Sequence, residues 1–262
     1  MGVTAPPNQK SKLVQAAADA KVPWIFPNDW SPDTADESLI GDMMLAGQKK
    51  KPRDLIDQLG VSSWISVSTG FWYEWSLGLP LGYGFNIRNR AVTLYDDGEA
   101  KTTTSTWPQV GRAMAALLSL KVYPEGGEDK SPSLDMFRNS WVYVSSFTIS
   151  QKDMLESLLR VTQTSLDDWK IAKEGTQNRY KAGIEQLKSG DRFGFVKAMY
   201  VRAFYPDGSG NVEKTKGLHN KLLGLPKEDI DESTKVAIQR AAELVKWEQA
   251  VNKYQAGELG HE

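Results

Sequence analysis

Apolar residues recur at two different spacings in the first part of the chain. Over residues 9–21, "QKSKLVQAAADAK", they follow a helical spacing, whereas the runs 22–26, "VPWIF", and 61–69, "VSSWISVST", favour short buried strands. A second helix is predicted over 43–59, and Gly60 follows it as a C-cap residue would. Helices that alternate with buried strands in this way predict an α/β fold with a parallel sheet.

Glycine and proline residues, which interrupt regular secondary structure, refine this pattern. Gly47 and Pro52 favour a break in the helix over 43–59, and the polar stretch 31–41 is predicted to be a loop. The segment 91–107, "AVTLYDDGEAKTTTSTW", places Asp-Gly between two β-prone runs, which predicts a hairpin that would hold Asp96 and Asp97 in its turn.

Further along, the elements become mostly helical. Pro108 lies in the first turn of a helix predicted over 108–120, and a strand is expected over 140–149. Ser150 and Asp153 then have capping-box spacing. "DDWKIAKEG" suits one more strand, and from about residue 175 the apolar spacing is helical, ending in a stripe whose members are Ala237, Ala241, Leu244, Trp247, Val251 and Tyr254. We therefore expect a partial Rossmann-like region over 1–150 and a mostly helical region over 151–262.

Composition and charge exclude several classes of function. The chain has 262 residues, of which 40% are hydrophobic and 25% charged, and a net charge of −1, so nothing favours nucleic acid or an anionic membrane as a direct partner. It has no cysteine, which excludes disulfides and thiolate chemistry and fits a reducing, cytoplasmic location. With only two histidines, a histidine-rich metal site is a poor candidate. No apolar run approaches the ~18 residues that a membrane span needs.

Three stretches, taken together, resemble the NmrA-like and isoflavone-reductase-like group of atypical short-chain dehydrogenases/reductases. They are "NQKSKLVQAAADAKVPWIFPNDWSPD", "KKKPRDLIDQLGVSSWISVSTGFWYEW" and "VTLYDDGEAKTTTSTWPQVGRAMAALL", and they cover roughly residues 3–120 in the family's order and spacing. "GVSSWI…GFWYEWSLGLP" is similar in particular to a fungal branch often called CipA-like. The resemblance implies a Rossmann-like fold and an NAD(P)H-dependent oxidoreductase, with NADP as the usual cofactor and a small aromatic or polyketide-like substrate.

The family's Gly-rich phosphate loop does not occur in this sequence. "GLPLGYGF" is the nearest glycine cluster, and it lies between a strand and the expected hairpin instead of at a strand-to-helix turn. The chain thus resembles a relative that starts at the fourth strand, with three strand–helix units, about 80 residues at ordinary element lengths, expected before it. A truncated gene, a fragment and a short paralogue all remain open, and we expect the chain as given to bind NADP(H) weakly or not at all.

The resemblance also implies site residues. Lys49 falls where related reductases carry a proton-transferring lysine, with Lys50 and Lys51 as alternatives if the register differs. Because ligands lie at the carboxyl ends of parallel strands, cofactor contacts are expected at Thr4, Pro27 and Asn28. Substrate contacts are expected at Trp30, Gly70, Phe71, Trp72 and Trp75, and Glu74 among these aromatics is expected at the surface.

Structural interpretations compete with each of these. The run "QKKKP" is also typical of a solvated helix face, and Trp30 and the aromatics of "GFWYEW" could simply pack in a core. The C-terminal stripe is more typical of packing or of a homodimer contact than of a site. Two functional alternatives stay open beside a reductase: a non-catalytic, dinucleotide-sensing NmrA-like regulator, and an inactive remnant.

Overall fold

The chain folds into two compact units whose segments alternate along the sequence. The computed structural model describes residues 8–255, with side chains as far as Leu244. Unit 1 comprises the described residues up to 71 together with 102–148 and 207–227, and unit 2 comprises 72–101, 149–206 and the described residues from 228 onward. The expected division of the sequence at residue 150 remains a prediction.

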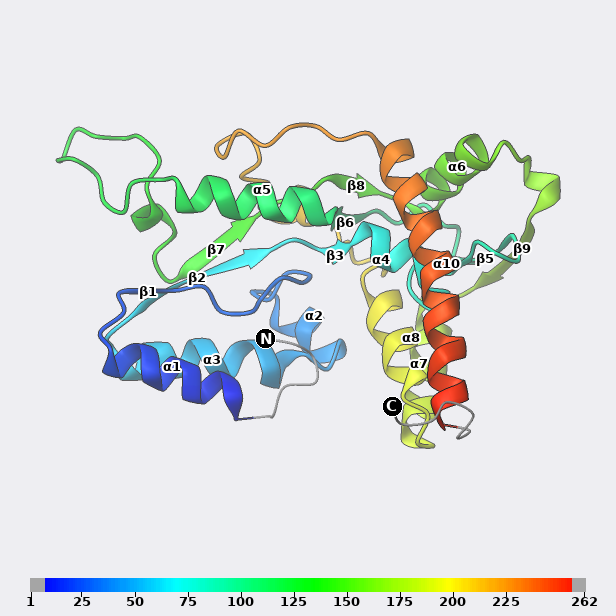
Figure 1. The fold of residues 1–262 in the computed structure, drawn as a ribbon, viewed down its shortest axis with the longest axis horizontal. Coiled ribbons are helices and arrows are strands. Elements are labelled where there is room, and N and C mark those ends of the chain that lie inside the picture. The colour runs from blue at the N-terminus through cyan, green and yellow to red at the C-terminus, as the bar shows by residue number, and fades with distance from the viewer. Residues whose placement is uncertain (1–7, 256–262) are drawn as a thin grey trace. The chain divides into compact units, whose positions relative to one another are not determined.

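A parallel sheet lies at the centre of unit 1 (Figure 1). Strands β1 (Trp24–Ile25), β2 (Ser63–Ser68) and β7 (Ser140–Tyr143) pair in the order β1-β2-β7. Helices α1 (Gln9–Asp19) and α3 (Ala46–Leu59) cover one face, and α5 (Trp107–Leu118) covers the other. A parallel sheet with helices on both faces is the α/β arrangement that the sequence predicted. Helices cover both faces because parallel sheets are normally buried on both sides.

Alternate side chains of β2 supply the two cores on either side of the sheet. Trp64 points toward α1 and α3, where it packs with Val14 and Ile56. Ile65 and Val67 point the other way and pack beneath α5 with its Ala113 and Leu117. All six residues of β2 are buried, as expected for a central strand covered on both faces.

Helix α3 is continuous, so the expected break was wrong. Pro52 lies inside it and has no N–H to donate to the carbonyl of Gln48. That carbonyl instead accepts a hydrogen bond from Nζ of Lys10, at 3.0 Å, which compensates for the missing helix bond. Gly60 ends the helix at φ +64°, as predicted.

Two of the remaining elements differ from the sequence interpretation. A short helix, α2 (Glu37–Asp42), forms within the stretch predicted as loop, and Asp36 caps it by accepting from the N–H of Leu39. The strand expected over 140–149 is two strands, because β7 ends at Tyr143 and β8 (Phe147–Ile149) joins β3 (Phe71–Trp72) and β6 (Thr102–Ser105) in a separate sheet of order β3-β6-β8. A 3₁₀ turn, η1 (Leu134–Phe137), and helix α9 (Val212–Lys216) complete the unit.

The predicted hairpin over 91–107 does not form. Strand β5 (Ala91–Tyr95) pairs with β4 (Phe85–Asn86) and with β9 (Lys170–Glu174), while β6 belongs to the other sheet. The turn chemistry is present, with φ of +53° at Asp96 and +76° at Gly98. However, the carboxylate of Asp96 accepts from the N–H and the hydroxyl of Thr176, so the turn is fastened to the start of α7 instead of closing a hairpin.

Unit 2 consists of this sheet and a group of helices. Its helices are α4 (Tyr73–Gly78), α6 (Gln151–Thr162), α7 (Thr176–Lys188), α8 (Phe193–Arg202) and α10 (Ile230–Gln255), with a 3₁₀ turn, η2 (Leu166–Asp168), before β9. Helix α10 packs on α4 and α6, and α7 packs on α8. The Ser150–Asp153 capping box starts α6 as predicted. Ala237 of the predicted stripe is buried, whereas the side chains of Trp247, Val251 and Tyr254 lie outside the described set.

No helix in the described part of the chain has the length and apolar character needed to cross a bilayer.

Candidate functional site

The loop that follows β1 stays beside β2 past the end of the strand. Ser31 forms a parallel bridge with Ser68, and its carbonyl accepts from the N–H of Thr69 at 3.2 Å. The segment "PNDW" is therefore held at the carboxyl end of β1 within unit 1, the position that the sequence predicted for ligand contacts.

A buried ion pair lies directly beneath this loop. Asp29 and Arg53 of α3 contact each other, with side chains that are 2% and 7% exposed. The same carboxylate accepts from the hydroxyl of Ser66 at 2.7 Å and from that of Thr34 at 3.2 Å. A buried carboxylate with three donors is fully compensated, so this group fixes the loop against both the helix and the central strand.

The guanidinium of Arg53 is also held by two indole rings. Its Cζ lies 5.6 Å from the ring centroid of Trp64 and 5.1 Å from that of Trp141. Its Nη2 donates to the carbonyl of Thr34 at 3.0 Å, and Trp141 Nε1 donates to the Thr34 hydroxyl at 2.9 Å. Cation–π contacts add to the ion pair, and the arginine has little freedom to leave it.

Lys49 lies one helical turn before Arg53 and turns toward the same loop. Its Nζ donates to the carbonyl of Asn28 at 2.7 Å. Burial lowers the pKa of this lysine to about 8, against the opposing effect of the Asp29 charge; Lys10 and Arg53 lower it further. Lys50 is exposed and pairs with Glu37 at 2.6 Å, and Lys51 is exposed, so Lys49 is the member of the "KKK" run that faces inward.

A cavity of about 240 Å³ adjoins this loop on the side of α1. Pro27, Asn28 and Trp30 line it, so three residues predicted to contact cofactor or substrate share one hollow. Leu13, Val14 and Ala17 of α1 form the apolar side, and Lys10 stands at its edge. Trp30 also packs against the core beneath α5, so its structural and functional interpretations are compatible.

A second polar group occupies the carboxyl end of β7. The hydroxyl of Tyr143 donates to the carboxylate of Asp33 at 3.1 Å, and burial raises the pKa of both side chains. His219 stacks on the Tyr143 ring with centroids 6.1 Å apart, and its Nδ1 accepts from the backbone N–H of Tyr143 at 3.0 Å. Burial lowers the pKa of this histidine, which favours the neutral form that can accept this bond.

The other predicted residues are distributed over both units. Gly70 and Phe71 are buried in unit 1, and Gly70 has a steric role: at φ +64°, a Cβ there would lie 1.9 Å from the carbonyl oxygen of Thr103. Trp72 and Trp75 belong to unit 2 and are 37% and 38% exposed. Thr4 lies outside the described residues. The surface position expected for Glu74 was wrong, because its side chain is buried.

Sequence reasoning missed most of the polar network. The sequence did not predict a site role for Arg53, Ser66, Asp33 or Tyr143. Lys49 and Arg53 are nevertheless four residues apart and therefore share a helix face. That spacing was the available signal. The hydrogen bond between Tyr143 and Asp33 joins residues 110 positions apart, and no local sequence pattern indicates it.

Several helix starts that follow strands are closed to a dinucleotide pyrophosphate. A cradle for this group needs free N–H groups at a helix start after a strand. The helices α2, α5 and α6 follow strands, but their first turns are closed by side chains of the chain itself, those of Asp36, Thr106 and Ser150. At the start of α7, which follows β9, the N–H of Thr176 is bound by Asp96. Helix α4 follows β3 without a side-chain cap and has only six residues. The loop before α2 is moreover acidic, so it disfavours a phosphate. Among the described residues, no group of three or more histidine, aspartate or glutamate side chains is placed to hold a metal ion.

Comparison with solved structures defines the class of fold. An isoflavone reductase matches with a TM-score of 0.65 at 13% identity, over 89% of this chain and 72% of that one. A structure from work on pinoresinol-lariciresinol and phenylcoumaran benzylic ether reductases gives 0.63 at 17%, over 88% and 71%. The NADPH-dependent quinone oxidoreductase QOR2 of Escherichia coli, in complex with NADPH, gives 0.57 at 17%, over 89% and 72%. The chain therefore has the Rossmann-like α/β fold of these reductases.

Curated relatives agree with this class. The oxidoreductase aprR of Aspergillus flavus is 24% identical over 236 residues, which cover 88% of this chain and 73% of that protein. The oxidoreductase poxI of Penicillium oxalicum is 25% identical over 177 residues, which cover 66% of this chain and about half, 51%, of that protein. No protein-family model matches the chain. Together with the structures, these relatives confirm the predicted resemblance to the NmrA-like and isoflavone-reductase-like group.

Proposed function

We propose that this chain carries the proton-donating side of a reductase-type site, in which Lys49 protonates an oxygen of a small aromatic or polyketide-like substrate. The proposal rests on the position of Lys49. Its ammonium is largely removed from water and donates a hydrogen bond to the carbonyl of Asn28, at the carboxyl end of β1. A lysine whose pKa lies near 8 can give up a proton near neutral pH far more readily than an ordinary lysine.

The residues around Lys49 suit this role. The ammonium of Lys49 donates a hydrogen bond to the backbone carbonyl of Asn28, which fixes its direction. Burial and the charges of Lys10 and Arg53 favour the neutral form, the negative charge of Asp29 favours the protonated one, and together they place the pKa at about 8. Arg53 fixes Asp29 in turn through their ion pair.

The substrate class rests on the lining of the neighbouring cavity and on the structural neighbours. Phe26, Trp30 and Leu13 give the cavity an apolar wall suited to a flat ring. One neighbour, with a TM-score of 0.53, was solved with NADP+ and (+)-pinoresinol, an aromatic compound. Proton donation completes a reduction only when a hydride donor such as NADPH is bound, and the proposal assigns the binding of that donor to no described residue.

The first test measures the pKa of Lys49 independently of any bound cofactor. Dimethylation of the lysines with ¹³C-formaldehyde, followed by NMR titration, measures each amine directly. Lys49 should titrate near pH 8, and the matched variant Lys50→Met should leave that resonance in place, whereas Lys49→Met removes it. An ordinary titration near 10.5 for every lysine would refute the proposed proton donor.

Turnover is then measured as oxidation of NADPH in the presence of aromatic carbonyl compounds and quinones. Calorimetry should show NADP(H) affinity weaker than micromolar, and a micromolar affinity would contradict that expectation. If NADPH binds at high concentration and is oxidised, Lys49→Met should lower turnover about 100-fold or more, and Lys50→Met should not.

One observation favours a different function. The closed helix starts of α2, α5 and α6 suit a non-catalytic relative of the reductases. In that case no substrate would accelerate NADPH oxidation, although Lys49 would still titrate near pH 8. The lysine titration and the NADPH-oxidation assay therefore distinguish an inactive site with a low-pKa Lys49 from a site in which Lys49 has an ordinary pKa.

A further inference from the structure

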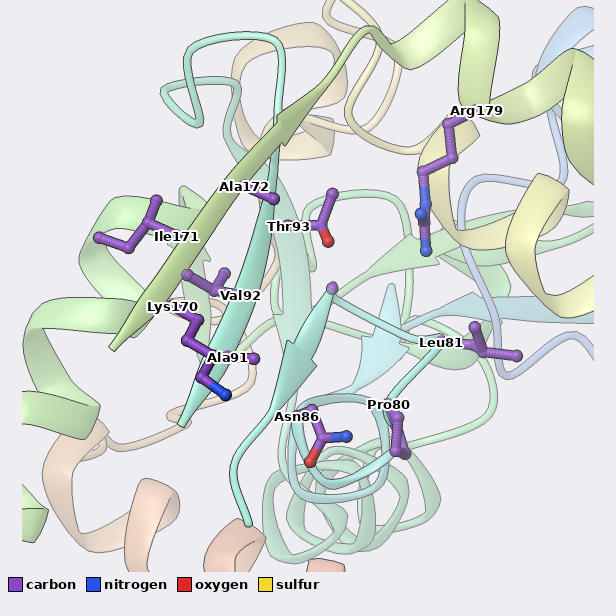
Figure 2. A pocket seen from close by; sticks show the side chains of 11 residues that line it. Pro80, Leu81, Asn86, Ala91, Val92, Thr93, Lys170, Ile171, Ala172 and Arg179 are labelled. Carbon is purple, nitrogen blue, oxygen red and sulfur yellow. The ribbon is translucent and has the colours of Figure 1, made fainter. Parts of the chain in front are cut away.

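A cavity of about 470 Å³ lies on one face of the β4-β5-β9 sheet in unit 2. Figure 2 shows its lining, to which three elements contribute a nitrogen-bearing side chain: Asn86 from β4, Lys170 from β9 and Arg179 from α7. All of its lining residues belong to unit 2, so this cavity is separate from the site beside Lys49. Its volume is in the range that holds small organic ligands, ~300–1,000 Å³.

The register of β5 and β9 explains why there is space for a cavity above these strands. Ala91 stands opposite Lys170, and Thr93 stands opposite Ala172, so these four side chains share one face. Three of them are small, which leaves space above the strands. Gly84 continues this floor at φ +85°, where a Cβ would lie 2.5 Å from the carbonyl oxygen of Thr93, so no side chain could fill the hollow from that position. Pro80 and Leu81 add an apolar edge.

A buried arginine supplies positive charge to this floor. The side chain of Arg179 is 8% exposed, and its Cζ lies 4.9 Å from the ring centroid of Tyr95. Its Nη1 donates to Glu174 at 2.7 Å, while its Nε has no hydrogen-bonding partner among the described residues. Arginine is rarely buried with an unsatisfied donor, so the guanidinium is incompletely compensated by its own chain.

The charge balance around the cavity is positive. Glu174 is shared between Arg179 and Lys197, whose Nζ lies 3.7 Å away, so one carboxylate faces two cations. Lys170, an exposed residue of the lining, adds a third positive charge and forms no ion pair with any residue that the structure describes. An anion in this cavity would meet a net positive field above a small, largely apolar floor.

We propose that the cavity on the β4-β5-β9 sheet binds a small organic anion with a flat apolar body, such as an aromatic carboxylate or aryl phosphate. The body lies over Ala91, Ala172 and Gly84, and the anionic group meets Arg179 near the last residue of β9. Lys170, the first residue of that strand, adds positive charge at a longer distance. Carboxylates and phosphates share the planar or multidentate acceptor chemistry that guanidinium groups recognise. The Asn86 amide can donate to the same ligand from the opposite side.

The test uses the full chain and three probes of similar shape: benzoate, phenyl phosphate and neutral benzamide. Binding is followed by ligand-observed saturation-transfer NMR and by calorimetry. At least one of the two anions should bind saturably, with a Kd of about 1 mM at low salt, and the comparison between them identifies the preferred anion. Benzamide should bind at least tenfold more weakly, and added salt should weaken the anion.

Two pairs of variants locate the site without disturbing the buried arginine. Lys170→Gln should weaken the anion about threefold, whereas Lys173→Gln, on the opposite face of the same exposed strand, should not change it. Ala172→Tyr should fill the hollow and abolish binding, whereas Lys173→Tyr, at an exposed neighbour that faces away from the cavity, should leave binding intact.

Equal binding of benzamide and the anions, or equal effects within either pair, would overturn the proposal. So would the absence of saturable binding of either anion at 10 times the expected Kd. Circular dichroism of each variant confirms that strand β9 still forms, and because its side chains are exposed or half-buried, both tyrosine substitutions should fold.

Discussion

Asp29→Asn is the substitution that tests the buried network most directly. Asparagine has the shape of aspartate and keeps an acceptor oxygen for the hydroxyls of Ser66 and Thr34. What it removes is the negative charge that compensates Arg53, whose side chain is 7% exposed. The variant therefore isolates the charge of the ion pair from its hydrogen bonds.

The expected cost is large for a single substitution. Removing one partner of a buried ion pair typically costs about 3–5 kcal/mol, because the other charge is left without compensation. Here Arg53 keeps its bond to the carbonyl of Thr34 and its contacts with two indole rings, which places the expectation near the lower limit, at about 3 kcal/mol. Asp54→Asn, at an exposed carboxylate one residue beyond Arg53, should change stability by less than about 0.5 kcal/mol.

Urea unfolding, followed by tryptophan fluorescence and far-ultraviolet circular dichroism, measures the free energy of unfolding when both signals coincide. The double variant Asp29→Asn/Arg53→Met completes a mutant cycle. Because it removes both charges, it should be more stable than the sum of the single effects predicts, with a coupling of about 2 kcal/mol. Additive effects, or a cost below about 1 kcal/mol for Asp29→Asn, would refute the view that this pair fixes the loop.

Two further substitutions test Lys49 and Gly70. Because the folded-state pKa of Lys49 is lowered to about 8 from 10.5, the unfolded chain binds more protons between these values, so stability should rise with pH across that window. Lys49→Met should lack this rise, and a parallel pH profile in the two proteins would contradict the lowered pKa. Gly70→Ala should cost at least about 2 kcal/mol in urea unfolding, because the methyl group would overlap the carbonyl of Thr103 at a positive φ. Gly47→Ala, which meets nothing within 4 Å inside α3, should be neutral or slightly stabilising, and an equal loss at both glycines would disprove the steric reason.

The elements that the sequence predicted correctly have strong local signals. Pro108 in the first turn of α5 and the Ser150–Asp153 capping box each act within four residues, and the strand over 61–69 has Trp64, Ile65 and Val67 at its centre. The parallel sheet followed from the order of these elements. Gly60 at the end of α3 likewise needed only its own conformational freedom.

The failures concern pairings that local chemistry does not decide. Asp97-Gly98 turns the chain as predicted, but the partner of β5 is β9, which follows far along the sequence. Pro52 favoured a break in α3 because the compensating Lys10 belongs to another helix. The charge run around Lys49 and Arg53 suggested a solvated face, and only the packing of two tryptophans and one aspartate around it shows otherwise.

The interleaving of the two units affects how the chain can fold during its synthesis. Unit 1 needs residues 207–227: the carbonyl of Gly210 accepts from Thr103 N–H, the ring of His219 covers Tyr143, and the carbonyl of Pro226 accepts from the Gln109 amide. The ribosome must therefore release the chain past residue 227 before unit 1 can close, and until then the apolar faces of its parallel strands stay exposed. We expect such a protein to depend on chaperones more than one whose domains emerge in sequence.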